Sequence, residues 1–220
     1  MENLRTHQIG FGATEMRKRV FDVLFAILVL FFLLSWLIPL MAILIKLDSS
    51  GPVFFKQLRS GRNNKPFYCL KFRSMIVNKE ADWLQARHDD VRITRIGAFI
   101  RKSNIDELPQ FINVLLGDMS VVGPRPHMLK HTEEYSWKIE NYMERHKIPP
   151  GITGWAQVSG LRGETTEDVA MENRVKADLW YMENRTMSLD VKIILLTVWL
   201  SFYPVHQDRV TSLMKQSELA

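Results

Sequence analysis

The densest group of chemically capable residues is NIDELPQFINVLLGDMSVVGPRP, residues 104–126. Two adjacent carboxylates, Asp106 and Glu107, precede apolar residues at helical spacing. Pro109 is compatible only with the first turn of that helix, so the carboxylates stand at a helix N-terminus. There they could cap the helix and offset its dipole. Because basic residues closely precede them, they could equally hold a divalent cation and offer a nucleophile.

Two further motifs carry residue types that bind anions. The sequence GPRP, residues 123–126, puts Arg125 in a turn that proline restricts on both sides. The sequence GITGWAQVSGLRG, residues 151–163, contains four glycines, which let backbone amides approach an anion. Each motif alone also fits a structural turn or a loop that binds nothing.

The histidines and the cysteine argue against several other chemistries. His127 and His131 are one helical turn apart, but no third ligand is near, so a zinc site is not expected. Neither HExxH nor a local signature of Ser-His-Asp or Cys-His catalysis occurs. The single Cys69 excludes an internal disulfide and suits a reducing cytosol.

These residues must be positioned by a chain that begins with an apolar segment. Residues 23–45, VLFAILVLFFLLSWLIPLMAILI, contain no charge. They would form a helix of about 35 Å, enough to cross a hydrocarbon core of about 30 Å. The run is too long for a signal peptide and no small-residue cleavage site follows it. Basic residues flank both ends, which favours a cytoplasmic location for both.

Ser35 and Pro39 indicate where this helix breaks. Pro39 removes one backbone hydrogen bond and clashes with the carbonyl of Ser35, whose hydroxyl could satisfy part of the disrupted ladder. A helix that bends here could enter and leave the same leaflet as a re-entrant helix. An ordinary kinked single span fits the same residues. Asp22, at the edge of the apolar run, is expected to pair with Lys18 or Arg19 one turn back.

The rest of the chain predicts a mostly helical α+β domain. Two short strands, 52–56 and 66–72, are expected to form a hairpin around a basic turn. Helices are predicted over residues 78–88, 106–116, 129–146, 165–183 and 189–203. The last of these is apolar almost all round, which indicates burial or a place in the membrane interface.

Net charge narrows the class of ligand. The chain has a formal net charge of +5 and a pI of about 9.3. Next to a membrane segment, a basic surface favours anionic lipid head groups or phosphorylated substrates over nucleic acid.

Several blocks of sequence occur in order over roughly residues 16–200: KRVFD, the apolar segment, IKLDSSGPVFFKQLRSG, LKFRSM, IDELPQFINVLLGDMSVVGPRP and PPGITGWAQVSG. Together they resemble the monotopic bacterial sugar transferases, or phosphoglycosyl transferases. The resemblance implies an enzyme that moves a sugar-1-phosphate from a UDP-sugar to undecaprenyl phosphate and releases UMP. That reaction is the first membrane step of surface polysaccharide or glycoconjugate synthesis.

The resemblance also assigns roles to residues. Asp106 would be the nucleophile that forms a covalent aspartyl-phosphosugar. Glu107 would hold Mg²⁺, the implied cofactor, and assist proton transfer from the lipid phosphate. Lys71, Arg101 and Arg125 are expected to bind the substrate phosphates, because a carboxylate attacks a diphosphate only when the charge is neutralised.

Three points concern the match to the family. Asp178, in KADLWYMEN, matches a family position near the nucleotide. The family commonly has Ser-Pro at the bend of its membrane helix, whereas here Ser35 is followed by Trp36, and the proline is Pro39. The break is therefore expected to shift by about one turn. Some members carry four preceding membrane helices, so this chain is expected to be a minimal member or an excised catalytic part.

The implied organisation is a re-entrant membrane helix, a small β-hairpin and a helical cytosolic catalytic domain on the surface of the bacterial inner membrane. The expected regions are a flexible N-terminus (1–15), the re-entrant helix (16–47), the catalytic domain (48–205) and a C-terminal tail (206–220). Expected partners are the UDP-sugar, undecaprenyl phosphate and inner-membrane lipid, with downstream glycosyltransferases as further candidates. The oligomeric state is open, with a homodimer as one option.

Two other functions fit parts of the sequence. A non-catalytic, membrane-anchored basic scaffold for a polysaccharide assembly complex would use Asp106 and Glu107 only as helix caps. A transferase that moves the sugar alone would release UDP instead of UMP. The sequence does not identify the sugar. Side chains around the loop after Gly151 are expected to select it.

Overall fold

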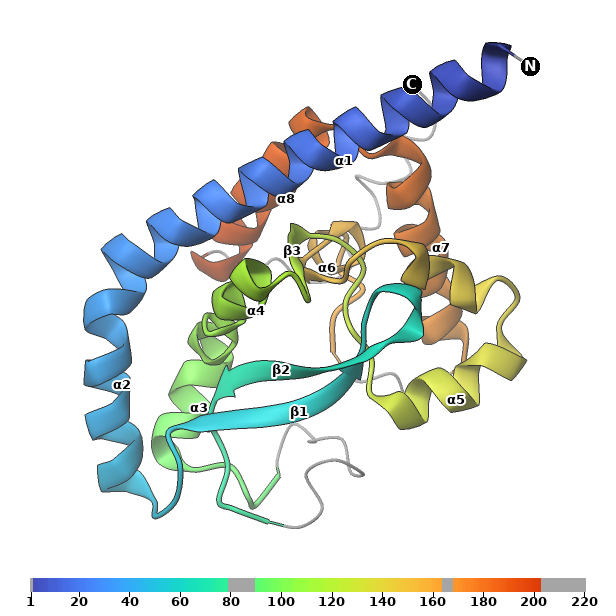
Figure 1. Cartoon of the computed structure of the whole chain (residues 1–220). Coiled ribbons are helices and arrows are strands. Elements are labelled where there is room, and N and C mark those ends of the chain that lie inside the picture. Colours follow the sequence, from blue (N-terminus) through green and yellow to red (C-terminus); the bar gives the residue numbers. More distant parts are fainter. Residues whose placement is uncertain (1, 79–89, 164–167, 203–220) are drawn as a thin grey trace.

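The computed structural model describes residues 2–78, 90–163 and 168–202 of the 220-residue chain. Its elements, in chain order, are α1 (Glu2–Val29), the π-helical turn η1 (Leu30–Leu34), α2 (Ser35–Asp48), β1 (Phe54–Ser60), η2 (Arg62–Asn64), β2 (Pro66–Phe72), α3 (Arg95–Lys102), η3 (Ile105–Glu107), α4 (Gln110–Leu116), β3 (Ser120–Val122), α5 (Leu129–Lys138), η4 (Tyr142–Lys147), β4 (Gly151–Thr153), α6 (Trp155–Val158), α7 (Asp168–Asn184) and α8 (Met187–Phe202). The described part of the chain is mostly helical, as predicted, with small two-stranded sheets (Figure 1).

The apolar segment lies in the long N-terminal helix. α1 continues through η1 into α2, and the chain changes direction sharply between α1 and α2 (Figure 1). The helix over Thr14–Asp48 is long and apolar enough to cross a membrane. α1 begins at Glu2, so helix extends into residues 1–15, which the sequence analysis assigns to a flexible N-terminus.

The break between α1 and α2 lies just before Ser35. The Ser35 hydroxyl donates to the carbonyl of Phe31 at 2.6 Å, and the Trp36 indole N–H donates to the carbonyl of Phe32 at 3.0 Å. Pro39 lies one turn later, inside α2, and has no N–H for the Ser35 carbonyl. Side chains thus supply hydrogen bonds to carbonyls of the π-helical turn, where apolar surroundings would supply none.

Both ends of the apolar segment are bound to the same domain. At one end, the Arg19 guanidinium donates to the carbonyls of Val114 and Leu115, at the end of α4, at 2.6 and 3.1 Å. At the other, an oxygen of Asp48 accepts the N–H of Ile96, at the start of α3, at 2.9 Å. Because only the turn η3 and a few residues separate α3 from α4, the two ends dock on neighbouring parts of the fold.

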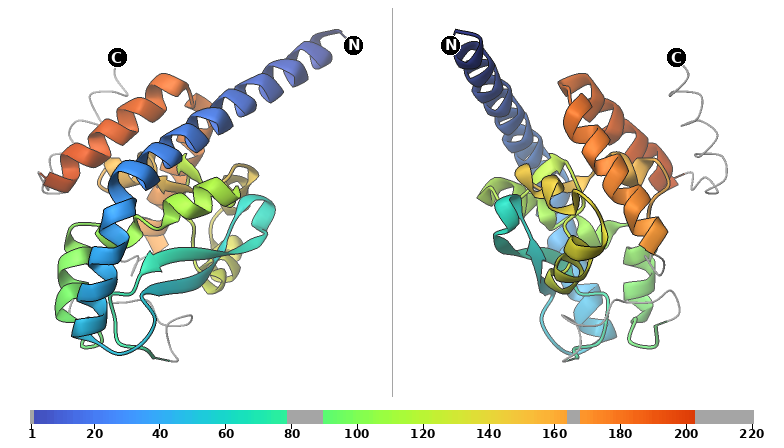
Figure 2. Two further views of the ribbon diagram at one scale, coloured as in Figure 1. Left: turned by 60° about the vertical axis from the view of Figure 1, so that its left-hand side comes forward. Right: turned by 90° about the vertical axis from the view of Figure 1, so that its right-hand side faces the viewer.

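Asp22 pairs with Lys18 as predicted, at 2.6 Å. Lys18 also lies 3.0 Å from Asp190 of α8. The buried Asp22 carboxylate accepts hydrogen bonds from the Ser120 hydroxyl and the Val121 N–H at 2.8 and 3.2 Å. This network joins α1 to β3 and α8, and α8 runs beside α1 (Figure 2).

The predicted hairpin is present: β1 and β2 pair antiparallel, with Phe54 opposite Phe72. β1 begins two residues later than predicted and continues to Ser60, so the connecting turn is shorter. A second sheet was not predicted. β3 pairs parallel with β4, with Ser120 opposite Gly151.

The glycine-rich residues 151–163 form β4 and α6, where the sequence predicts only a loop. A Cβ at Gly151 would lie 2.1 Å from the Gly123 nitrogen, and one at Gly154 would lie 2.2 Å from the Gly123 oxygen. These glycines are therefore required by the close approach of the backbone near β3 and β4, a structural role that the anion-binding interpretation did not include.

Two predicted helices differ in the structure. The helix predicted over 106–116 is divided into the 3₁₀ turn η3 and α4, which begins only at Gln110. The helix predicted over 129–146 is wrong as one element: α5 ends at Lys138, and η4 is a separate 3₁₀ turn. Asn141 adopts a left-handed conformation, with φ of 59°, which interrupts the helix. The helix predicted over 78–88 falls almost wholly on residues outside the described ranges. α7 and α8 begin and end within about three residues of the predicted bounds.

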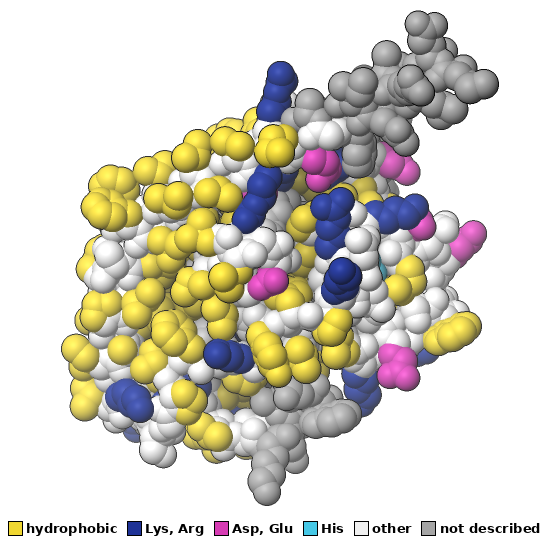
Figure 3. Space-filling view, in the orientation of Figure 1, with side chains coloured by type: hydrophobic (Ala, Val, Ile, Leu, Met, Phe, Trp, Pro, Cys, Tyr) yellow, Lys and Arg dark blue, Asp and Glu magenta, His cyan; other side chains and the backbone are white. Residues whose placement is uncertain are grey.

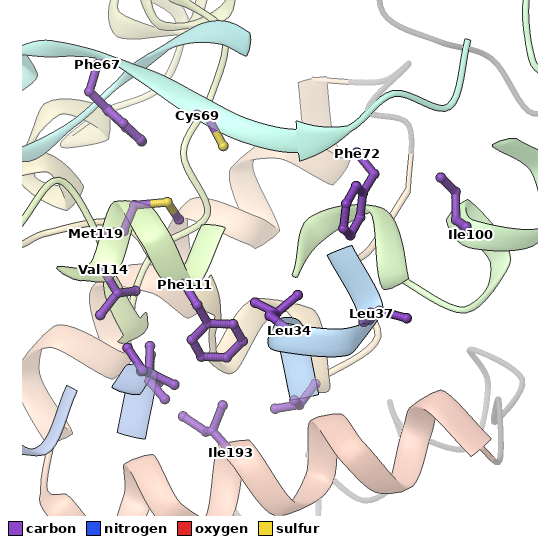
Figure 4. Close-up of a cluster of buried hydrophobic side chains, with 14 of the residues drawn as sticks. Leu34, Leu37, Phe67, Cys69, Phe72, Ile100, Phe111, Val114, Met119 and Ile193 are labelled. Atoms are coloured by element: carbon purple, nitrogen blue, oxygen red, sulfur yellow. The ribbon is translucent and has the colours of Figure 1, made fainter. Parts of the chain in front are cut away.

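One hydrophobic core joins the apolar segment to the domain. Leu34 of η1 and Leu37 of α2 share a buried cluster with Phe72 of β2, Phe111 of α4 and Ile193 of α8 (Figure 4). The opposite face of the segment is exposed and apolar along its length: Leu24, Ile27, Leu28, Phe31, Phe32, Trp36, Leu40, Ile43 and Leu47. Figure 3, in the orientation of Figure 1, shows apolar side chains gathered along the edge of the molecule where α1 and α2 lie.

Candidate active site

Asp106 and Glu107 lie on the 3₁₀ turn η3, directly before Pro109 and α4. Asn104, at the start of the turn, has a left-handed backbone with φ of 56°. In the described part of the chain, neither carboxylate bonds a backbone N–H of α4. The turn thus directs both side chains away from the capping positions that their place in the sequence suggested.

Two cations fix the Glu107 carboxylate. Lys71 of β2 lies 2.6 Å from Oε1. Arg125 binds both oxygens, at 2.6 Å to Oε1 and 3.0 Å to Oε2, which is the bidentate geometry of a strong charge-assisted pair. Burial alone would raise the pKa of Glu107, but the charges of Arg125 and Lys71 hold that pKa well below its usual value. Glu107 is therefore ionised throughout the physiological range.

Asp106 is buried beside this cluster, and no described residue bonds its side chain directly. Its side chain is 7% exposed, and it has no hydrogen bond or ion pair within the described residues. Burial, with the charge of Glu107, raises the pKa of Asp106 to about 6, although Lys71, Arg101 and Arg125 oppose the rise. At pH 7 and above, Asp106 is a poorly solvated carboxylate, a form suited to nucleophilic attack.

Arg101 reaches the site from the last turn of α3. It is half-buried, and within the described ranges it has no hydrogen bond or ion pair. Its charge lowers the pKa of Asp106, which places it within electrostatic range of that carboxylate. Arg101 is thus a cation available to an anionic ligand, whereas Arg125 and Lys71 are already engaged with Glu107.

Asp178 lies behind the site. It forms a buried pair with Arg145, whose Nη2 and Nε lie 2.6 and 3.0 Å from Asp178 Oδ2, with both side chains 1% exposed. Arg145 also donates to the backbone carbonyl of Arg125 at 2.7 Å. The structure therefore brings Lys71, Arg101 and Arg125 around the acidic pair but puts Asp178 outside it, where it anchors the turn that carries Arg125.

A cavity of about 820 Å³ is lined by the acidic pair and by Lys71, Arg101 and Arg125. Its lining includes polar side chains that sequence reasoning did not select: Gln57, Arg59, Arg92, His131, Gln157, Arg162 and Arg174. Arg174 precedes Asp178 by one helical turn on α7, a spacing that could have identified it. The others come from β1, α5, α6 and connecting segments, and no local pattern relates them to the acidic pair.

His127 also lines the cavity. Its Nδ1 lies 2.7 Å from the Tyr142 hydroxyl, and burial holds the pKa of His127 well below its usual value. The imidazole is therefore neutral. Within the described residues, no group of three or more His, Cys, Asp or Glu side chains could hold a metal ion by itself.

The donor set fits Mg²⁺, which proteins often bind through one or two carboxylates while substrate phosphates and water complete the octahedron. Glu107 Oε2 accepts one hydrogen bond, from Arg125, which leaves a lone pair for a metal. Asp106 supplies a neighbouring carboxylate with no hydrogen-bond partner among the described residues. The site therefore has the oxygen ligands that a metal-bound diphosphate requires.

Known proteins resemble this chain over most of its length. Residues 13–203 match the sequence model of the family described as bacterial sugar transferase. The UDP-glucose:undecaprenyl-phosphate glucose-1-phosphate transferase of Escherichia coli (strain K12) is 47% identical over 192 residues, covering 87% of this chain and 41% of that protein. The protein of the same name from Caulobacter vibrioides is 46% identical over 187 residues, covering 84% of this chain and 70% of that protein.

A third relative has a different sugar in its name. The UDP-N-acetylgalactosamine-undecaprenyl-phosphate N-acetylgalactosaminephosphotransferase of Aeromonas hydrophila is 44% identical over 182 residues, covering 82% of this chain and 42% of that protein. The chain thus spans about two fifths of the length of the relatives from Escherichia coli and Aeromonas hydrophila.

Proposed function

The chain belongs to the bacterial sugar transferase family, and we propose that it moves a sugar-1-phosphate from a UDP-sugar to undecaprenyl phosphate and releases UMP. The observation that carries the proposal is the buried Asp106, which has no partner among the described residues, beside a cation-bound Glu107 in a basic cavity. The names of the relatives supply the two substrates and leave the sugar open between glucose and N-acetylgalactosamine.

Asp106 acts as the nucleophile in this proposal. Its carboxylate oxygen attacks the phosphorus that carries the sugar, and the bond from that phosphorus to UMP breaks, with UMP taking the bonding pair. An aspartyl-phosphosugar forms on the protein. An oxygen of undecaprenyl phosphate then attacks the same phosphorus, which restores the Asp106 carboxylate and gives the lipid diphosphate sugar.

The cations make this attack possible, because a carboxylate and a diphosphate repel each other. Lys71 and Arg125 keep Glu107 ionised and contribute positive potential at the attacked phosphorus. Arg101, which has no ion pair within the described residues, binds a phosphate oxygen directly. The Asp178–Arg145 pair holds the Arg125 backbone, so that the guanidinium starts from a fixed position.

Mg²⁺ is the proposed cofactor, with Glu107 as its protein ligand. When bound, the metal would neutralise the diphosphate of the UDP-sugar. The lowered pKa that keeps Glu107 ionised suits a metal ligand but makes it a weak base, so the proton-transfer role that the resemblance implied is not part of this proposal.

We further propose that residues 16–47 enter and leave the cytosolic leaflet of the bacterial inner membrane as a re-entrant helix. The support is geometric: Arg19 and Asp48, at the two ends, both bind the catalytic domain, and the helix breaks between them. A single span would separate these ends by the thickness of the bilayer. The exposed apolar face of the segment provides the surface that lipid would cover.

The function is tested by incubating the purified protein in detergent with Mg²⁺, undecaprenyl phosphate and a panel of UDP-sugars that includes UDP-glucose and UDP-N-acetylgalactosamine. UMP should appear with at least one sugar, and Asp106→Asn should abolish it. The matched control is Asp168→Asn, at an exposed position of α7, which should leave the rate unchanged. Release of UDP would contradict the proposal, as would normal turnover by Asp106→Asn.

A further inference from the structure

One part of the lining of the cavity that contains the acidic pair comes from two helices and is mostly apolar. On one side the lining residues recur at every fourth position of α1 and η1: Phe25, Val29 and Leu33. On the other side they form one stripe of α8, at intervals of three, four and seven residues: Ile194, Thr197, Val198 and Ser201. Such spacings put each set on one face of its helix, so two narrow stripes line the same space.

This wall continues to the acidic pair. Leu108, two residues after Asp106, and Phe111 both line the cavity. The Phe111 ring centroid lies 6.0 Å from that of Phe25 on α1. Apolar side chains therefore extend from the turn that carries Asp106 to the membrane segment.

An ion pair links the two helices near the start of α8, Lys18 to Asp190 at 3.0 Å. Further along α8, Val198 lines the cavity and is also 53% exposed. The cavity lining thus includes a surface-exposed position of α8. Both helices also carry exposed apolar residues, among them Leu28 of α1 and Phe202 of α8.

We propose that this apolar wall, the α1/α8 channel, binds the first isoprene units of the lipid acceptor. The inference rests on the proposed function and adds the site of the acceptor's hydrocarbon chain. The acceptor has to bring its phosphate to Asp106 while its tail stays out of water and away from the basic side chains. The α1/α8 channel is the part of the cavity lining to which the membrane segment itself contributes, and the same segment carries the exposed apolar face on its other side.

The opposite wall has different chemistry. Arg59, His131, Arg162 and Arg174 line the cavity from β1, α5, the segment after α6, and α7. A uridine diphosphate fits cations and hydrogen-bond donors better than it fits Phe25, Val29 and Ile194. The two substrates would therefore approach Asp106 from different walls, which suits a reaction in two successive half-reactions.

Bulky substitutions in the channel provide the test. Val198→Trp and Ile194→Trp add an indole to the stripe that lines it, whereas Leu195→Trp adds the same indole at an adjacent position that is 65% exposed and does not line the cavity. With a UDP-sugar and no acceptor, all three variants should release UMP once, as wild type does. With undecaprenyl phosphate, the acceptor KM should rise about tenfold or more in the two channel variants and stay within about twofold in Leu195→Trp.

A binding measurement makes the test independent of turnover. A polyprenyl phosphate with a diazirine in its second isoprene unit should, on irradiation, label peptides that contain residues 25–33 and 194–201, as read by mass spectrometry. This result would support the channel even if no UDP-sugar gave UMP and the proposed function failed. Labelling confined to other peptides would overturn the channel. An equal acceptor KM in the channel variants and wild type, with a normal UMP burst, would overturn it too.

Discussion

Asp106→Asn should abolish activity and also stabilise the protein at neutral pH. Burial raises the pKa of Asp106 from 3.8 to about 6, with the attraction of Lys71, Arg101 and Arg125 already included. Between these values the folded protein holds a proton that the unfolded chain has lost, so stability falls as pH rises from about 4 to about 6. The amide introduced by Asp106→Asn has the same shape and carries no charge, so the stability of the variant does not fall over this pH range.

The magnitude follows from the shift. A change from 3.8 to about 6 corresponds to about 3 kcal/mol at pH 8, since each pH unit is worth about 1.4 kcal/mol. About half of this difference should remain at pH 5 and little at pH 4. For a protein of this size 1 kcal/mol moves the unfolding midpoint by about 2–4 °C, so the Tm of Asp106→Asn should exceed that of wild type by about 6 °C or more at pH 8.

The assay is thermal unfolding in detergent and metal-free buffer, with wild type and variant compared at pH 4, 5 and 8. Asp168→Asn is the control, because its side chain is 63% exposed and its replacement should leave Tm nearly unchanged. A lower Tm for Asp106→Asn at pH 8 is what a helix-capping role would produce. That outcome, or a difference that did not depend on pH, would refute the reasoning.

Three other outcomes are expected. Asp106 must be ionised to attack, and its pKa is about 6. The rate of UMP release should therefore fall about tenfold for each pH unit below that pKa. A rate that stayed constant down to pH 4.5 would contradict the assignment. Arg145→Met leaves the Asp178 carboxylate buried without its partner and should lower the free energy of unfolding by about 3–5 kcal/mol. Adding Asp178→Asn should restore most of that stability. If it does not, the broken pair is not the cause of the loss. Arg125→Lys keeps the charge but loses the bidentate contact with Glu107. The kcat/KM for the UDP-sugar should fall about 10- to 100-fold, with Tm little changed. An unaltered kcat/KM would show that the contact is dispensable.

The elements that follow from local pattern were predictable. The apolar segment, the hairpin, α7 and α8 each have a periodicity that depends only on neighbouring residues. The Lys18–Asp22 pair was predictable for the same reason, because residues four apart on a helix are adjacent.

The elements that depend on distant contacts were not predictable in this way. The β3–β4 sheet pairs two three-residue strands far apart in the chain, and neither strand has a sequence feature that identifies the other as its partner. The break at Asn141 depends on a left-handed conformation that the helical pattern of residues 129–146 conceals. Short strands and single-residue breaks have too weak a local signal to outweigh an adjacent helical pattern.

The same distinction between local patterns and distant contacts applies to the candidate site. The family resemblance assigned roles to Asp106, Glu107, Lys71, Arg101 and Arg125. The fold brings these five together. The raised pKa of Asp106 comes from burial by distant residues and could not be read from the IDELPQ motif. The place of Asp178 behind Arg125 depends on Arg145, a residue with no local signal.

The central claim is that Asp106 carries the phosphosugar between the two substrates, and one measurement tests it directly. The enzyme is mixed with Mg²⁺ and a productive UDP-sugar in the absence of undecaprenyl phosphate, and both the UMP released and the mass of the Asp106 peptide are measured. We predict about one UMP per enzyme molecule and a peptide heavier by one sugar phosphate at Asp106. No UMP without the acceptor, or an adduct on another residue, would contradict the account.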